Sequence, residues 1–94
     1  MNNGGERKSR LYKAVLCLQN EDECKKFFDD LCTVNELKAM EQRFEVATLL
    51  NEGHIYNEIL ELTGASSATI SRVNRSLNYG AGGYQTVFLR MEEK

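Results

Sequence analysis

Residues 56–77 read YNEILELTGASSATISRVNRSL, and this stretch decides the predicted fold because two helical segments in it flank one glycine. The apolar spacing predicts one helix over about residues 55–62 and a second over about residues 67–77. Gly64 lies between them, and glycine tolerates the positive φ that a sharp turn between steeply crossing helices requires. Apolar residues fill four inward positions of such a unit, namely Ile59, Ala65, Ile70 and Val73. The stretch is therefore predicted to be a helix-turn-helix.

Two positions of this unit depart from its usual pattern. Thr63 is polar at an inward site that is usually apolar, and Leu60 is large at a site that is usually small. We expect the fold to accommodate both, because cores tolerate moderate changes of side-chain shape.

The second predicted helix has an outward face without acidic residues. Small hydroxyl side chains let a helix approach base edges closely, and arginine can donate to guanine or bind phosphate. Ser66 is placed to cap this helix, whose N-terminal amides favour phosphate. We predict base-edge contacts by Ser67, Ala68, Thr69 and Ser71, phosphate or guanine contacts by Arg72 and Arg75, and a DNA-facing cap at Ser66.

The charge distribution agrees with a local DNA-binding surface. The formal net charge of the chain is -2, which by itself argues against a nucleic-acid partner. Residues 1–61 carry twelve acidic and eight basic side chains, whereas residues 62–91 carry three arginines and no acidic residue. The sequence therefore describes a basic surface on an acidic body.

The rest of the chain also has helical rather than alternating apolar spacing, and it contains no proline. We expect a first helix that begins near Leu11 and ends near Asn20, which can cap the next helix. A T-x-x-E capping box at Thr33 starts a third helix that ends at about Glu52. A short last helix follows the glycines at 80–83. The predicted fold class is all-α, with about six helices.

The length of 94 residues favours one small domain that gains stability from a partner. A chain this short buries a modest core, and several apolar stripes compete for its interior. We predict a single helical domain over residues 9–94 and a homodimer. Residues 1–8 are polar and include two adjacent glycines, so we expect a flexible N-terminal arm.

The sequence has no convincing catalytic or metal-binding pattern. Cys17, Cys24 and Cys32 have the spacing of neither a metal pair nor a disulfide framework, so we expect buried thiols. His54 is the one histidine, and its place after a glycine indicates a loop or capping role. No segment has the pattern of a signal peptide or a membrane span. We therefore predict a cytoplasmic protein with no enzyme activity, no metal site and no membrane partner.

The stretch from Leu49-Leu50 through Leu77, with its Thr-Gly-Ala-Ser-Ser-Ala-Thr-Ile-Ser-Arg and closing Asn-Arg-Ser-Leu, resembles the DNA-reading region of the tryptophan repressor family. The resemblance extends back to about Glu36, and chain length and helix order also agree. Within the family, the chain looks most similar to the branch labelled YerC/YecD. The resemblance implies six helices, an intertwined dimer formed mainly by the N-terminal helices, and two reading heads that enter successive major grooves.

The same resemblance implies control by a small effector. Arg43 and Arg72 match two arginines that sandwich the ligand in the repressor, and Ser76 matches a residue that helps to hold the amino group of the ligand. Val73 takes the place of a glycine, and its branched side chain would crowd an indole. The resemblance thus implies a small-molecule corepressor site, at which tryptophan itself is disfavoured. A different small effector, or none, is compatible with the sequence.

The leading hypothesis is a sequence-specific transcriptional regulator, acting as a homodimeric repressor on double-stranded DNA. The alternative is a helical protein-interaction module, in which the same helix pair docks on a polypeptide and the arginines meet acidic side chains. The two differ in whether binding of a partner depends on nucleic acid. An enzyme has no supporting site in the sequence.

Overall fold

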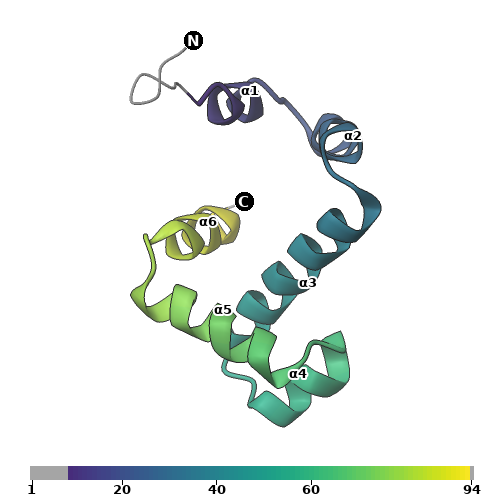
Figure 1. The fold of residues 1–94 in the computed structure, drawn as a ribbon. Coiled ribbons are helices and arrows are strands. Elements are labelled where there is room, and N and C mark those ends of the chain that lie inside the picture. Colours follow the sequence, from purple (N-terminus) through teal and green to yellow (C-terminus); the bar gives the residue numbers. More distant parts are fainter. Residues whose placement is uncertain (1–8, 94) are drawn as a thin grey trace. The chain divides into compact units, whose positions relative to one another are not determined.

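The computed structural model describes residues 9–93, and within this range every regular element is a helix. The elements in chain order are α1 (Leu11–Leu16), α2 (Glu21–Leu31), α3 (Val34–Asn51), α4 (Tyr56–Thr63), α5 (Ser67–Tyr79) and α6 (Gly83–Glu92) (Figure 1). The predicted all-α class and helix order are confirmed. The arm predicted at residues 1–8 lies outside the described range. In that range no helix combines the length and the apolar character that crossing a membrane requires.

Side-chain caps start two helices where the sequence predicted them. Asn20 Oδ1 accepts a hydrogen bond from the Glu23 amide at 2.9 Å and begins α2. At α3, Thr33 Oγ1 accepts from the Glu36 amide at 3.0 Å, and the Glu36 carboxylate accepts from the Thr33 amide at 2.9 Å. This reciprocal pair is the predicted capping box, and it satisfies amides that a helix start leaves without partners.

The first helix is shorter than predicted, because it ends at Leu16 rather than near Asn20. The Cys17 amide donates to the Ala14 carbonyl at 3.0 Å, which is a tighter turn than an α-helix makes. Asn20 itself has extended backbone, with φ -155° and ψ 172°, as its capping role requires. The chain must therefore leave the helical conformation before Asn20.

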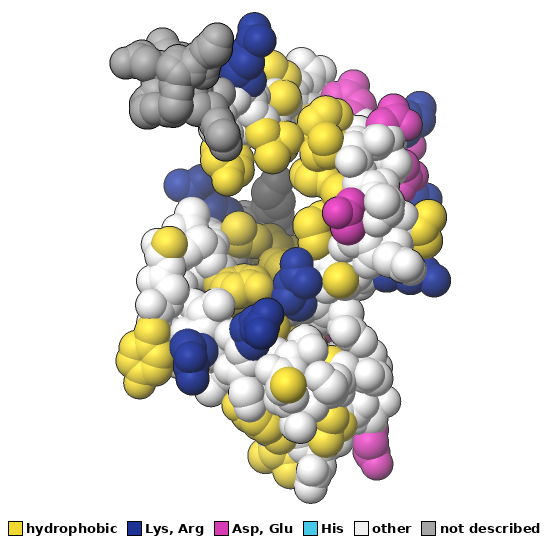
Figure 2. Space-filling model, viewed as in Figure 1, with side chains coloured by type: hydrophobic (Ala, Val, Ile, Leu, Met, Phe, Trp, Pro, Cys, Tyr) yellow, Lys and Arg dark blue, Asp and Glu magenta, His cyan; other side chains and the backbone are white. Residues whose placement is uncertain are grey.

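The chain divides into two compact units within α3, the first ending at Leu37 and the second beginning at Lys38. The first unit contains α1, α2 and the start of α3, and no residue of α1 or α2 is buried. Figure 2 shows hydrophobic side chains at the surface over both helices. Cys17 is exposed and the other two cysteines are half-buried, so the prediction of buried thiols is wrong. Two short helices do not supply enough surrounding surface to enclose a side chain.

The second unit has an apolar core to which α3, α4, α5 and α6 all contribute. Its buried residues are Val46, Ala47, Leu49, Ile59, Ala65, Ile70, Val73, Leu77 and Phe88. The four inward positions predicted for the helix-turn-helix are among them, each at most 3% exposed. At α6, the Phe88 ring centroid lies 5.5 Å from that of Phe44 and 6.0 Å from that of Tyr84. This packing fixes α4 and α5 against α3 and positions the candidate site.

Candidate nucleic-acid interface

The corner between α4 and α5 is the sharp turn that the sequence predicted. Gly64 has φ 71° and ψ 7°, the left-handed conformation, and its amide donates to the Leu60 carbonyl at 2.9 Å. A residue with a Cβ adopts this conformation only at a steric cost, so glycine is the natural residue here. The backbone can therefore end α4 and turn at once into α5.

Thr63 shows how the turn accommodates a polar residue at an inward site. Its hydroxyl donates to the Ile59 carbonyl at 2.7 Å and accepts from the Ala65 amide at 3.1 Å. Both bonds are local, so the half-buried hydroxyl is satisfied without a partner from another element. Thr63 therefore adds hydrogen bonds to the corner that an apolar residue at this site would lack.

Ser66 caps α5 as predicted. Its Oγ accepts a hydrogen bond from the Thr69 amide at 3.1 Å and donates to Thr69 Oγ1 at 3.1 Å. The other amides of the first turn of a helix have no acceptor within that helix, and together they give its N-terminus a partial positive charge. This end of α5 is consequently suited to a phosphate oxygen.

The outward face of α5 has the exposure that reading DNA requires. Ile70, Val73 and Leu77 are buried on the opposite side. Six of the seven predicted DNA contacts are exposed and one, Thr69, is half-buried; the exposed residues are Ser66, Ser67, Ala68, Ser71, Arg72 and Arg75. On the face shown in Figure 2, no acidic side chain lies over α5. Within residues 9–93 the ion pairs involve Lys26 and His54, so both arginines of α5 keep their guanidinium groups available.

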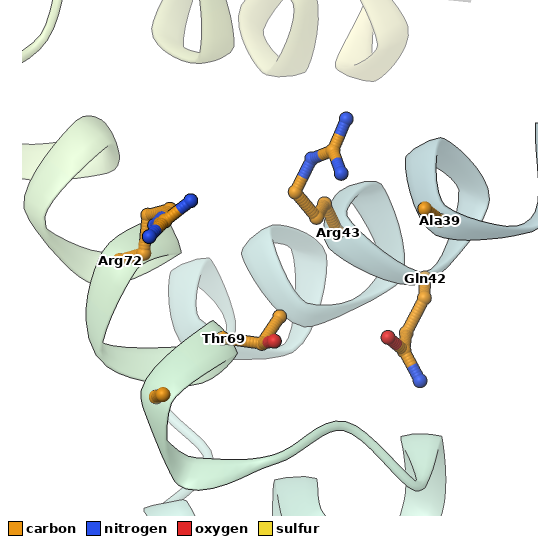
Figure 3. A pocket seen from close by; sticks show the side chains of 6 residues that line it. Ala39, Gln42, Arg43, Thr69 and Arg72 are labelled. Atoms are coloured by element: carbon orange, nitrogen blue, oxygen red, sulfur yellow. The ribbon is translucent and has the colours of Figure 1, made fainter. Parts of the chain in front are cut away.

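A shallow pocket of about 220 Å³ lies between α3 and α5. It is lined by Ala39, Gln42 and Arg43 from α3 and by Ala68, Thr69 and Arg72 from α5, and no acidic residue contributes to it. In Figure 3 the side chains of Arg43 and Arg72 extend to the same side of the pocket, and Gln42 points to the opposite side. Two of the three predicted effector residues are thus brought together.

The third predicted effector residue, Ser76, is in a different place. It lines a separate groove of about 400 Å³ together with Phe44, Ala81, Gly83, Tyr84 and Val87. Ser76 lies one helical turn beyond Arg72 on α5, and residues of α6 complete its groove. Val73 is 2% exposed, belongs to the core and does not line the pocket of the two arginines.

Sequence reasoning missed the part that Gln42 plays. Its Nε2 donates to the Thr63 carbonyl at 3.2 Å, a contact between residues 21 positions apart in the chain. Thr63 is the last residue of α4, so this bond links the helix-turn-helix to α3. No local pattern indicates such a contact, because it exists only after α3 and α4 have packed together.

The comparisons with known proteins bear on the same elements. The model of the Trp repressor protein family matches residues 6–92. The chain belongs to the Trp repressor family. Among its relatives within this family is the uncharacterised protein YerC of Bacillus subtilis, 48% identical over 89 residues, which cover 95% of this chain and 86% of the relative.

Two solved structures extend the Trp repressor likeness to three dimensions. A TrpR-like protein from Eubacterium eligens is 55% identical, with a TM-score of 0.85 over 88% of this chain and 86% of its own. A Trp repressor candidate from Staphylococcus aureus is 47% identical, with a TM-score of 0.85 over 90% of this chain and 85% of its own. The resemblance inferred from the helix-turn-helix is therefore confirmed along most of the chain.

Proposed function

We propose that the protein is a sequence-specific DNA-binding transcriptional regulator, and that it acts as a homodimeric repressor. The observation that supports this best is the exposed, acid-free face of α5, which follows directly on the Gly64 turn. Membership of the Trp repressor family supports the same class of function, that of a regulator rather than an enzyme. We assign the protein to the cytoplasm because the proposed DNA partner is reached there.

The proposed roles follow from what each side chain of α5 offers. Ser67, Ala68, Thr69 and Ser71 are small enough to let the helix approach base edges in a major groove. Arg72 and Arg75 supply the charge for phosphate or guanine contacts. Ser66 holds the first turn of α5, so that its amides point toward a backbone phosphate.

The proposed dimer is supported by the first unit of the chain. Apolar side chains are left uncovered there, with Leu16 85% exposed, Val34 71% exposed and Leu31 50% exposed. A second copy would remove this surface from water and so stabilise both chains. Two reading heads in a symmetric dimer would then meet major grooves about 34 Å apart on a near-palindromic operator.

We also propose the pocket of Arg43 and Arg72 as the effector site. Two guanidinium groups without a neighbouring carboxylate favour a ligand that carries an anionic group. Ser76 lines another groove, so the ligand is held by a set of residues that differs from the one implied by the resemblance. Val73 does not line this pocket, so the crowding of an indole expected from its branched side chain does not apply there.

Selection of bound fragments from a genomic library tests the proposed function. Purified protein is expected to retain a defined set of duplex fragments, with and without added amino acids. The affinity for a retained fragment should fall steeply as salt rises, because each phosphate contact releases about one counterion. Absent or salt-independent binding would overturn the proposal. Pull-down of a protein partner that survives nuclease treatment would instead favour the interaction module.

A further inference from the structure

Several polar groups of the α4–α5 corner have partners within the chain. The Gly64 amide is bonded to Leu60, the Ala65 amide to Thr63 and the Thr69 amide to Ser66. The last carbonyls of a helix have no partner in that helix. At the end of α4, the Thr63 carbonyl accepts a hydrogen bond from the side-chain amide of Gln42. The corner is therefore held by hydrogen bonds within the chain, while the other first-turn amides of α5 remain open to a phosphate oxygen.

Gln42 supplies a directional hydrogen bond between α3 and α4, which the surrounding apolar contacts do not. Val46 and Ala47 of α3 are fully buried in the same core cluster as Ile59 of α4. Apolar packing of this kind is strong but non-directional, so it resists separation of the helices more than small rotations between them. A hydrogen bond from a side-chain amide to a backbone carbonyl depends on angle as well as distance, and so it restricts those rotations.

We propose that Gln42 is a positioning residue that holds the helix-turn-helix in its DNA-binding orientation on α3. The proposal rests on the DNA-binding function proposed above. Gln42 acts through the Thr63 carbonyl and makes no contact with DNA itself. Gln42 also lines the pocket of Arg43 and Arg72, so the test must separate its bond to Thr63 from an effect on that pocket.

Substitution of Gln42→Met tests this, because methionine has a similar length and no donor. Protein is dialysed until mass spectrometry of the denatured sample finds no bound small molecule. Wild-type protein, treated in the same way and given the same additions, is the reference. In the variant, the affinity for that fragment should fall about tenfold. The salt dependence of binding should not change, since no phosphate contact is removed.

Amide hydrogen exchange on the free protein separates positioning from general stability. Gln42→Met should speed exchange of the Gly64 and Ala65 amides about tenfold. The His54 amide, which is bonded to the Leu49 carbonyl at the far end of α3, should keep its wild-type rate. Gln42→Glu should have the larger effect, because a carboxylate cannot donate to the carbonyl and repels it.

Gln85→Met is the matched control, since Gln85 of α6 also donates its side-chain amide to a backbone carbonyl, that of Leu77. It should leave exchange at the corner and DNA affinity at wild-type values. Unchanged exchange at Gly64 and Ala65 in Gln42→Met, or equally faster exchange at His54, would overturn the proposal. Wild-type protein that binds no DNA under any condition would defeat the proposed function, and the exchange data would still decide the role of Gln42.

Discussion

The two units of the chain differ in what they bury. In the second unit, Val46, Ala47, Ile59 and Ile70 have no exposed surface, and they form one core between α3 and the helix-turn-helix. In the first unit, α1 and α2 bury no residue at all. Packing within one chain therefore accounts for the stability of α3 to α6. The exposed apolar side chains of α1 and α2 are instead the reason for proposing a second copy.

The largest effect is expected from the core of the second unit. Ile70→Ala should lower the free energy of unfolding by about 3 kcal/mol, because it removes buried methyl groups and leaves a cavity. Ile55→Ala makes the same change at a position that is 62% exposed, and it should cost under about 0.5 kcal/mol. Urea denaturation of both variants measures the difference, and equal losses would contradict the core described for the second unit.

A smaller loss is expected where α5 ends. A Cβ at Gly80 would overlap the Ser76 carbonyl oxygen, which belongs to rigid backbone. Gly80→Ala should therefore cost roughly 2–3 kcal/mol of stability. Gly83→Ala, where an added Cβ meets nothing within 4 Å, should be neutral or stabilise by up to about 1 kcal/mol. Thermal unfolding of the two variants tests this difference. Equal unfolding temperatures would show that the turn at Gly80 shifts to accommodate the added Cβ.

The reading head should respond in binding rather than in stability. Arg75→Ala should weaken DNA binding by roughly 1–3 kcal/mol if the guanidinium reads a base, or reduce the salt slope by about one if it binds phosphate. Arg90→Ala on α6 removes an exposed arginine outside the helix-turn-helix and should change neither quantity. Fluorescence anisotropy with a selected fragment measures both. Unaltered binding by Arg75→Ala would remove this residue from the interface.

The first unit should respond in assembly. Leu16→Ala should raise the dimer dissociation constant about tenfold, because it removes apolar surface that the proposed dimer would cover. Leu62→Ala on α4, at 64% exposure, is the control and should leave dimerisation unchanged. Sedimentation over a concentration series gives the constants. A wild-type monomer at micromolar concentration would show that the first unit is not covered by a second copy.

The smallest contrast compares one helix cap in each unit. Ser66→Ala and Asn20→Ala each remove a cap and should each cost about 1 kcal/mol. Only Ser66→Ala should also weaken DNA binding, because α5 carries the reading face and α2 does not. Stability and DNA affinity are measured for both variants. Equal losses of affinity would contradict the assignment of DNA binding to the second unit.

Local features were the predictable part of the fold and of the site. The capping box at Thr33, the cap at Ser66 and the left-handed turn at Gly64 all depend on residues within four positions of one another. The inward positions of the helix-turn-helix follow from helical periodicity in the same way. The end of α1 was misjudged because apolar spacing continued past Leu16, whereas the capping conformation of Asn20 stopped the helix.

The amino-acid sequence by itself determined the helices, their caps, the turn and the acid-free face of α5, because each arises from interactions between near neighbours in the chain. The tertiary structure alone decided that Gln42 reaches the Thr63 carbonyl and that Ser76 lines another groove. The family resemblance had paired Arg43 with Arg72, and the structure places both in one pocket. These pairings join residues of different helices. They depend on the angle at which α3, α4 and α5 pack, and spacing along the chain does not specify that angle.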